Sequence, residues 1–204
     1  MSTQANTYLT LGHHSMAEFT DRGSKFIAYA YEVESVEVIK SIIKKLKEQH
    51  PKAVHVCFAY RLGFDQLQYR ASDDGEPSGS AGKPILGQID SAQLKNVLIA
   101  VVRYFGWVLL GVPGLINAYK TAAHLAIVEA TIVEKSRMQY FNLQFDYTQM
   151  NDVMRVLKMH HCQTIHQSLL IFCEMSIGVS FVEKDQVIKK LKDIQGVKLQ
   201  IEGL

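Results

Sequence analysis

The sequence predicts an α+β protein built from two domains, and three features of the 204-residue chain support this. Amphipathic helical patterns alternate with strand patterns, which is typical of mixed folds. All four prolines lie before residue 130, and the remainder has no proline and few glycines. The C-terminal part reads as strand, helix, strand, strand, helix, strand, which is the ferredoxin-like order. We therefore place the domains at residues 1–134 and 135–204.

The N-terminal domain contains a predicted strand at residues 25–31 and then an amphipathic helix. Ser35 is the candidate N-cap of this helix, and apolar residues recur at three- and four-residue spacing as far as Gln49. Pro51 follows and cannot continue the helix. The next elements are predicted as strand, strand, helix, strand and helix, at residues 54–60, 67–71, 84–89, 96–105 and 115–134.

The C-terminal domain has a complete pattern of its own, with alternating apolar residues in its strands. Its elements are predicted, in chain order, at residues 140–147, 149–160, 163–169, 170–179, 184–194 and 197–201. Because this pattern is complete, we expect residues 136–204 to unfold cooperatively when they are expressed alone.

Composition and charge exclude several classes of protein. The chain is 48% hydrophobic and 21% charged, which excludes disordered and low-complexity proteins. Its formal net charge is only +2. We therefore expect any RNA binding to be weak and electrostatic, and we expect no sequence-specific binding to DNA.

Targeting signals and metal motifs are not recognisable in the sequence. The longest apolar run, residues 97–102, is six residues, far below the ~18 needed to cross a bilayer, so no membrane partner is expected. Three scattered cysteines suit reduced thiols in the cytoplasm. The spacing of neighbouring His and Cys residues fits no zinc template, and we expect no metal or cofactor. These residues are His160, His161, Cys162 and His166.

The loop SDDGEPSGSAGKP offers the first candidate binding residues, which are Ser72, Asp73, Asp74, Glu76 and Lys83. Its carboxylates and glycines could hold a cation, an anion or a partner. Alternatively, the Asp and Ser side chains bond to their own backbone and make the loop rigid. We favour a recognition surface, and we expect stability to hold or rise when both Asp73 and Asp74 become Asn.

Two strands supply further candidates, His55 in one and Arg103 with Tyr104 at the end of the other. His55 could be a general base or could bond to a loop carbonyl. Cys57 lies on the same strand face and is favoured as a buried, inert thiol. Arg103 and Tyr104 could pair and stack with a nucleotide, or Arg103 could end in water with Phe105 in the core. No residue is assigned a catalytic role.

Four sequence blocks resemble the YigZ/IMPACT family across nearly the whole chain. They are GSKFIA at residues 23–28, HVCFAY at 55–60, SDDGEPSGSAGKP at 72–84 and VVRYFG at 101–106. The resemblance implies an N-terminal domain similar to the fourth domain of the translocation elongation factor and to GHMP kinases. It also implies that the appended domain resembles the ferredoxin-like fifth domain of that factor. Trp107 and Pro113 stand where the family usually has glycines.

The resemblance also implies a role near translation, since eukaryotic relatives regulate translation and bacterial relatives have been proposed to bind nucleic acid. We therefore expect a non-enzymatic, translation-associated protein that binds RNA, the ribosome or a regulatory protein through the loop and the adjoining strand end. The alternative is a small hydrolase or phosphotransfer enzyme that uses His55, Asp73 and Asp74.

Overall fold

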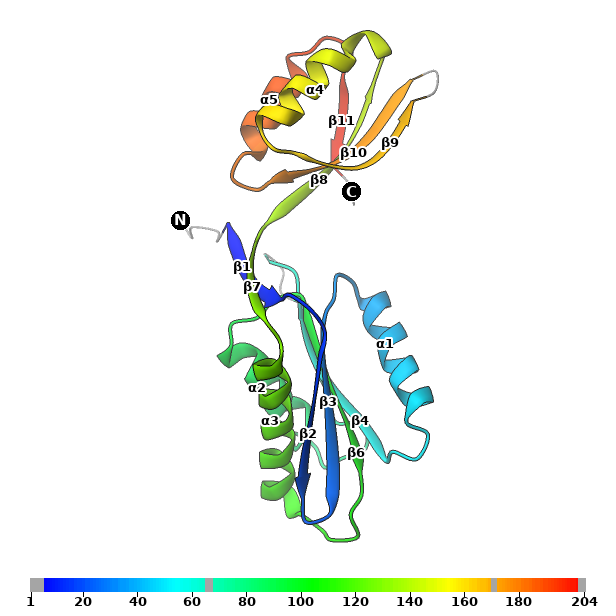
Figure 1. Cartoon of the computed structure of the whole chain (residues 1–204), viewed down its shortest axis with the longest axis vertical. Helices are drawn as coiled ribbons and strands as arrows, with labels where there is room; N and C mark the ends of the chain where they lie inside the picture. Colours follow the sequence, from blue (N-terminus) through cyan, green and yellow to red (C-terminus); the bar gives the residue numbers. More distant parts are fainter. Residues whose placement is uncertain (1–5, 65–67, 170–171, 202–204) are drawn as a thin grey trace. The chain divides into compact units, whose positions relative to one another are not determined.

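The computed structural model describes residues 6–64, 68–169 and 172–201. The chain forms two compact units (Figure 1). The larger unit is Tyr8–Lys135, and the smaller begins at Ser136 and includes Thr7. The α+β class is confirmed, with helices and antiparallel sheets in both units.

The larger unit is organised around a five-stranded antiparallel sheet with strand order β2-β3-β6-β4-β5. Its strands are β2 (Ser15–Asp21), β3 (Ser24–Glu32), β6 (Val97–Tyr104), β4 (His55–Leu62) and β5 (Gln68–Ser72). β6 is buried along nearly its whole length, which agrees with its unbroken apolar sequence. β1 (Thr7–Leu11) pairs with β7 (Ile132–Ser136) in a separate two-stranded sheet.

Helices cover both faces of this sheet (Figure 1). α2 (Gly82–Ser91) and α3 (Gly111–Glu129) pack on one face and form the main core with residues such as Phe26 and Val101. α1 (Val36–Gln49) packs on the other face through Leu46 and Ile39. The predicted cap is confirmed, because the backbone N–H of Val38 donates to the hydroxyl of Ser35 over 3.2 Å.

The smaller unit has the element order that the sequence predicts, β-α-β-β-α-β. The elements are β8 (Met138–Phe145), α4 (Met150–Met159), β9 (Gln163–Leu169), β10 (Cys173–Ser180), α5 (Lys184–Lys192) and β11 (Lys198–Ile201), with a short 3₁₀ turn at Tyr147–Gln149 before α4. The antiparallel sheet has the strand order β11-β8-β10-β9. Both helices pack on it through one apolar face each.

Several predicted boundaries are wrong, and three strands were not predicted. The unpredicted strands are β1, β2 and β7. β1 pairs with β7, which is distant in the sequence, and β2 pairs with β3 across a tight turn. The helix predicted at residues 115–134 begins at Gly111 and ends at Glu129, because Ile132–Ser136 extends to pair with β1. Pro113 lies in the first turn of α3, where a missing N–H has no cost. Leu67 and residues 170–171, which belong to predicted strands, lie outside the described residues.

Candidate binding site

The loop between β5 and α2 is held together by the carboxylate of Asp73. This carboxylate accepts backbone N–H groups from Gly79 at 2.8 Å, Ala81 at 3.0 Å and Gly82 at 2.8 Å. Two of these donors lie at the start of α2, which has no cap from its own N-cap side chain. Asp73 therefore satisfies the helix N-terminus from nine residues upstream of Gly82, and its negative charge suits that end of the helix dipole.

The pKa of Asp73 shows the same balance of forces. Burial alone would raise this pKa, but the hydrogen bonds from Gly79, Gly82 and Ala81 and the charge of Lys83 outweigh burial and lower it. The negative charge is thus stabilised by the loop itself. This geometry favours the alternative in which Asp73 makes the loop rigid by bonding to its own backbone.

Asp74 is also engaged within the domain. Its carboxylate accepts the backbone N–H of Val56 at 2.8 Å and forms an ion pair of 2.8 Å with Lys47 of α1. Its own backbone adopts a left-handed φ of 43°, which suits Asp better than most residues. The carbonyl oxygen of Asp74 lies 2.7 Å from Nδ1 of His55. Asp74 therefore connects the loop to both β4 and α1.

Glu76 is the most buried carboxylate of the loop. Nη1 of Arg103 lies 2.6 Å from its carboxylate, and the hydroxyl of Tyr119 donates to it over 2.7 Å. The side chain of Arg103 is only 7% exposed, so the predictions that it ends in water or pairs with a nucleotide are both replaced by a buried ion pair. Phe105, which the second of these alternatives placed in the core, is 38% exposed.

His55 and Cys57 complete the same cluster from strand β4. The hydrogen bond from Nδ1 to the carbonyl of Asp74 leaves Nε2 of His55 4.0 Å from Glu76, so His55 is the histidine bonded to a loop carbonyl. Cys57 is fully buried beside the carbonyl of Asp73 and the hydroxyl of Tyr119. Burial raises the pKa of its thiol to about 12, which keeps it protonated and unreactive.

The remaining sequence candidates lie elsewhere. Tyr104 follows Arg103 in β6 and so faces the opposite side of the sheet, where its hydroxyl lies 2.8 Å from Nδ1 of His50. Ser72 ends β5 opposite Phe58, and Lys83 is exposed at the start of α2. The structure therefore unites only part of the predicted site, namely His55, Asp73, Asp74, Glu76 and Arg103. We call this group, together with Cys57 and Tyr119, the loop cluster.

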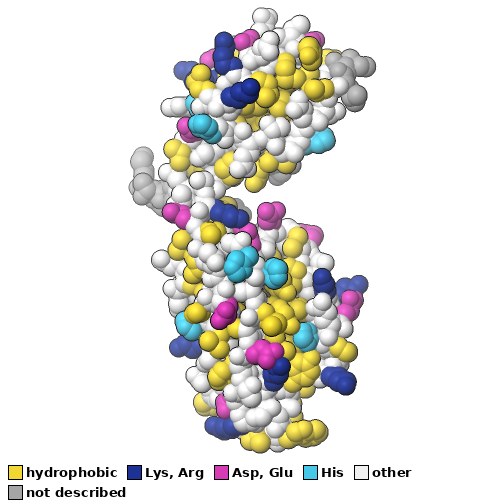
Figure 2. Space-filling model, viewed as in Figure 1, with side chains coloured by type: hydrophobic (Ala, Val, Ile, Leu, Met, Phe, Trp, Pro, Cys, Tyr) yellow, Lys and Arg dark blue, Asp and Glu magenta, His cyan; other side chains and the backbone are white. Residues whose placement is uncertain are grey.

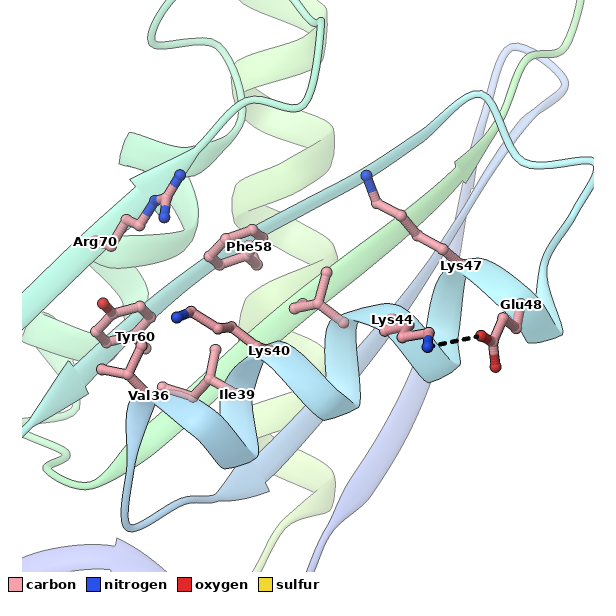
Figure 3. Close-up of a pocket in the computed structure, with 10 residues that line it drawn as sticks. Val36, Ile39, Lys40, Lys44, Lys47, Glu48, Phe58, Tyr60 and Arg70 are labelled. Carbon is pink, nitrogen blue, oxygen red and sulfur yellow. Dashed lines mark ion pairs between the residues drawn. The ribbon is translucent and has the colours of Figure 1, made fainter.

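An open groove lies on the opposite face of the sheet, between α1 and strands β4 and β5. Figure 3 shows that the side chains of α1 form one wall and that the strands form the floor. Its volume is about 490 Å³. The apolar lining residues are Val36, Ile39, Ile43, Phe58 and Tyr60, and the charged ones are Lys40, Lys44, Lys47, Glu48 and Arg70. We call this surface the α1 groove.

Four cations and one carboxylate give the α1 groove a positive rim. Two of these cations have carboxylate partners, since Lys44 lies 3.9 Å from Glu48 and Lys47 pairs with Asp74. Lys40 points into the groove beside Tyr60, and the guanidinium of Arg70 lies 5.8 Å from the ring centre of Phe58 (Figure 3). This arrangement can hold a ligand that is apolar on one side and negative on the other.

The positive rim is a local feature. On the face shown in Figure 2, basic and acidic side chains are interspersed and are not gathered by sign. Sequence reasoning missed the groove, although one signal was present. Lys40, Lys44 and Lys47 recur at four- and three-residue spacing beside the apolar stripe of the predicted helix. Their apolar neighbours on β4 could not be identified without the tertiary structure.

Metal binding and membrane spanning find no support in the described part of the chain. Among the described residues, no group of three or more His, Cys, Asp or Glu side chains could hold a metal ion. No helix in the same part of the chain is long and apolar enough to span a membrane.

Comparison with known proteins identifies relatives of this chain. The model of the Impact N-terminal domain matches residues 22–127. An IMPACT family member of Haemophilus influenzae is 35% identical over 161 residues, which covers 77% of both chains. The IMPACT family member YigZ of Escherichia coli is 31% identical over 180 residues and covers 87% of this chain and 88% of its own.

Solved structures extend the similarity to the fold. A hypothetical protein of known crystal structure is 26% identical, covers 96% of this chain and 97% of its own, and superimposes with a TM-score of 0.72. The two-domain translational regulator Yih1 is 28% identical over 58% of this chain and 48% of its own, but its TM-score of 0.41 is too low to relate the two folds. The family model and the long, 31–35% identical relatives together show that this chain belongs to the IMPACT family.

Proposed function

We propose that this chain is a translation-associated protein that acts by binding a regulatory protein partner, and that the α1 groove is its binding surface. The observation that carries the proposal is the combination of an apolar floor with a positive rim in an open groove. Core apolar contacts with a charged rim are the usual composition of a surface that recognises another protein.

Membership of the IMPACT family supports the link to translation, because the family resemblance implies translational regulation in eukaryotic relatives. We further propose that the larger unit resembles the fourth domain of the translocation elongation factor and that the smaller unit resembles its fifth domain. We also propose a cytoplasmic location, because a partner in translation would be found there. A fold-level likeness is an association, so the binding experiment below has to decide.

The loop cluster favours a binding protein over the hydrolase or phosphotransfer alternative. A general base needs a free lone pair beside its substrate. The carboxylate of Asp73 already accepts three N–H groups, and Asp74 accepts Val56 and pairs with Lys47. His55 donates Nδ1–H to the loop, and its Nε2 faces the buried carboxylate of Glu76 at 4.0 Å. These contacts make the cluster a structural support between the loop and the sheet.

The test reverses the charges of the two groove cations directed across the floor, in a Lys40→Glu/Arg70→Glu variant. Lys45→Glu is the matched control, because Lys45 is an exposed lysine of α1 that does not line the groove. Wild type and both variants are used to capture partners from lysate, with and without nuclease, and the proteins are quantified by mass spectrometry. We expect translation components that resist nuclease and that are lost only with the double variant.

Two results would contradict the proposal. One is that the double variant captures the same proteins as the wild type. The other is that every translation component disappears on nuclease treatment, which would make RNA the partner.

A further inference from the structure

Strand β5 forms the open side of the α1 groove and is an edge of the sheet. In the described part of the chain it has a strand partner, β4, on one side only. Residues Gln68–Ala71 are exposed, and only Ser72 is partly covered. An edge strand presents a row of backbone N–H and C=O groups that a second chain can pair with.

We propose that the partner contributes an extended acidic segment that adds to β5 as a further strand and places its apolar side chains in the α1 groove. This inference rests on the proposed function and names the chemistry of the partner. Strand addition beside a groove is a recognised mode of peptide binding, in which the backbone supplies affinity and alternate side chains supply specificity.

The dimensions of the groove suit this mode. Side chains on one face of a strand recur every ~6.6 Å, because each residue advances ~3.3 Å. Lys40, Lys44 and Lys47 of the facing helix are separated along its axis by ~6 Å and ~4.5 Å, from a rise of 1.5 Å per residue. An extended segment that carries both carboxylates and apolar side chains on the face toward the groove can therefore bring carboxylates near these lysines. Val36, Ile43 and Phe58 are partly exposed in the groove and can contact its apolar side chains.

The same contacts favour a peptide over single-stranded RNA. RNA needs roughly one cation for each phosphate that it brings, together with uncovered aromatic faces on which bases stack. Two of the four rim cations already have partners, Tyr60 is only 8% exposed, and the guanidinium of Arg70 lies over Phe58. A mixed apolar and acidic segment needs fewer free cations and fits the mainly apolar floor.

The experiment uses the full chain and a synthetic peptide of about seven residues as the probe. Every second residue is alternately glutamate or valine and the residues between them are threonine, so one face of the extended peptide carries both carboxylates and apolar side chains. The comparison ligands are two forms of this peptide, N-methylated on one backbone edge or on the other, a valine–lysine peptide in which lysine replaces glutamate, and an oligouridine of about ten nucleotides. Amide NMR shifts of the protein locate each ligand, and titration gives each dissociation constant. Lys40→Glu, Arg70→Glu and the control Lys45→Glu are titrated in parallel.

We expect the acidic peptide to shift amides of β5 and α1. N-methylation on the edge that faces β5 should weaken binding by about tenfold, because the backbone hydrogen bonds are lost. The valine–lysine peptide should not bind. Each groove variant should raise the dissociation constant of the acidic peptide by about fivefold or more. Lys45→Glu should leave this dissociation constant unchanged.

Equal binding of both N-methylated forms, or no shift at β5 at millimolar peptide, would overturn strand addition. Tighter binding of oligouridine would assign the groove to RNA instead. The two proposals fail in distinguishable ways. If the capture of translation proteins still requires Lys40 and Arg70 while the peptide does not bind, only the inference of strand addition is wrong. If the groove variant captures the same proteins as the wild type, the proposed function is wrong.

Discussion

The loop cluster and the α1 groove lie on opposite faces of one sheet and use charge in opposite ways. In the loop cluster, the carboxylates of Asp73, Asp74 and Glu76 each have hydrogen-bond or ion-pair partners within the domain. In the groove, Lys40 points in beside Tyr60 and the guanidinium of Arg70 lies 5.8 Å from the ring centre of Phe58, at the rim of an open apolar floor (Figure 3). Charged residues with internal partners stabilise a fold, whereas charges held at an open apolar surface are available to a partner.

The largest effect is expected at Glu76, whose carboxylate is buried with Arg103 and Tyr119. Glu76→Gln leaves Arg103 without a compensating charge, so the free energy of unfolding should fall by about 3–5 kcal/mol. Urea denaturation measures the loss. Glu129→Gln, which removes an exposed carboxylate from α3, is the control and should change little. A Glu76→Gln protein as stable as the wild type would remove the structural role of the cluster.

Asp73→Asn should reduce the free energy of unfolding by about 1–3 kcal/mol, because an amide forms weaker hydrogen bonds to Gly79, Ala81 and Gly82. Since its folded pKa is lowered, the carboxylate stabilises the protein above its unfolded pKa of about 3.9 and ceases to do so as the pH falls through the folded value.

The wild type and Asp73→Asn should therefore differ most near pH 7 and converge in acid, as followed by urea unfolding at a series of pH values. This reverses the sequence-based expectation that stability holds or rises when both Asp73 and Asp74 become Asn. An Asp73→Asn variant of undiminished stability at pH 7 would restore that expectation.

Lys47 belongs to both regions, because it lines the groove and pairs with Asp74. Both side chains of this pair are partly exposed, so Lys47→Ala should cost only about 0–1 kcal/mol of stability. The loss should shrink in high salt, where the ion pair of the wild type is screened. Lys45→Ala is the control on the same helix. A salt-independent loss of several kcal/mol would mean that Lys47 acts through packing and not through charge.

The smallest effect on stability is expected in the groove itself. The Lys40→Glu/Arg70→Glu variant should unfold within about 0.5 kcal/mol of the wild type, since neither side chain supports the core. Thermal and urea unfolding of the purified variant check this. A large destabilisation would show that the charged residues of the groove also support the fold. Loss of binding in this variant would then report misfolding.

Backbone conformation at Trp107 shows how family resemblance and structure complement each other. The resemblance implies glycine there, and the backbone at Trp107 keeps a left-handed φ of 65°. The side chain is 91% exposed, so it meets no steric obstacle although the conformation is unfavourable for a non-glycine residue. Gly106 beside it must be glycine, because a Cβ would lie 1.9 Å from the carbonyl carbon of Gly23.

Local sequence patterns were sufficient to predict the regular elements whose signals are contained within them. The helix that Ser35 caps, the buried strand β6 and the β-α-β-β-α-β order of the smaller unit all follow from periodicity and capping. The loop from Ser72 to Pro84 was singled out by its glycines and carboxylates, as a recognition surface or alternatively as a rigid loop, and the family blocks were identified from the sequence alone.

Tertiary structure alone decided which way the charges face. Glu76 meets Tyr119 across 43 residues of sequence, and Arg103 turns into the core because strand alternation places it under the loop and leaves Tyr104 on the other face. The α1 groove likewise combines a helix with strands that follow it in the chain. Periodicity reports which residues share a face of one element, but contacts between elements depend on packing, which no local pattern contains.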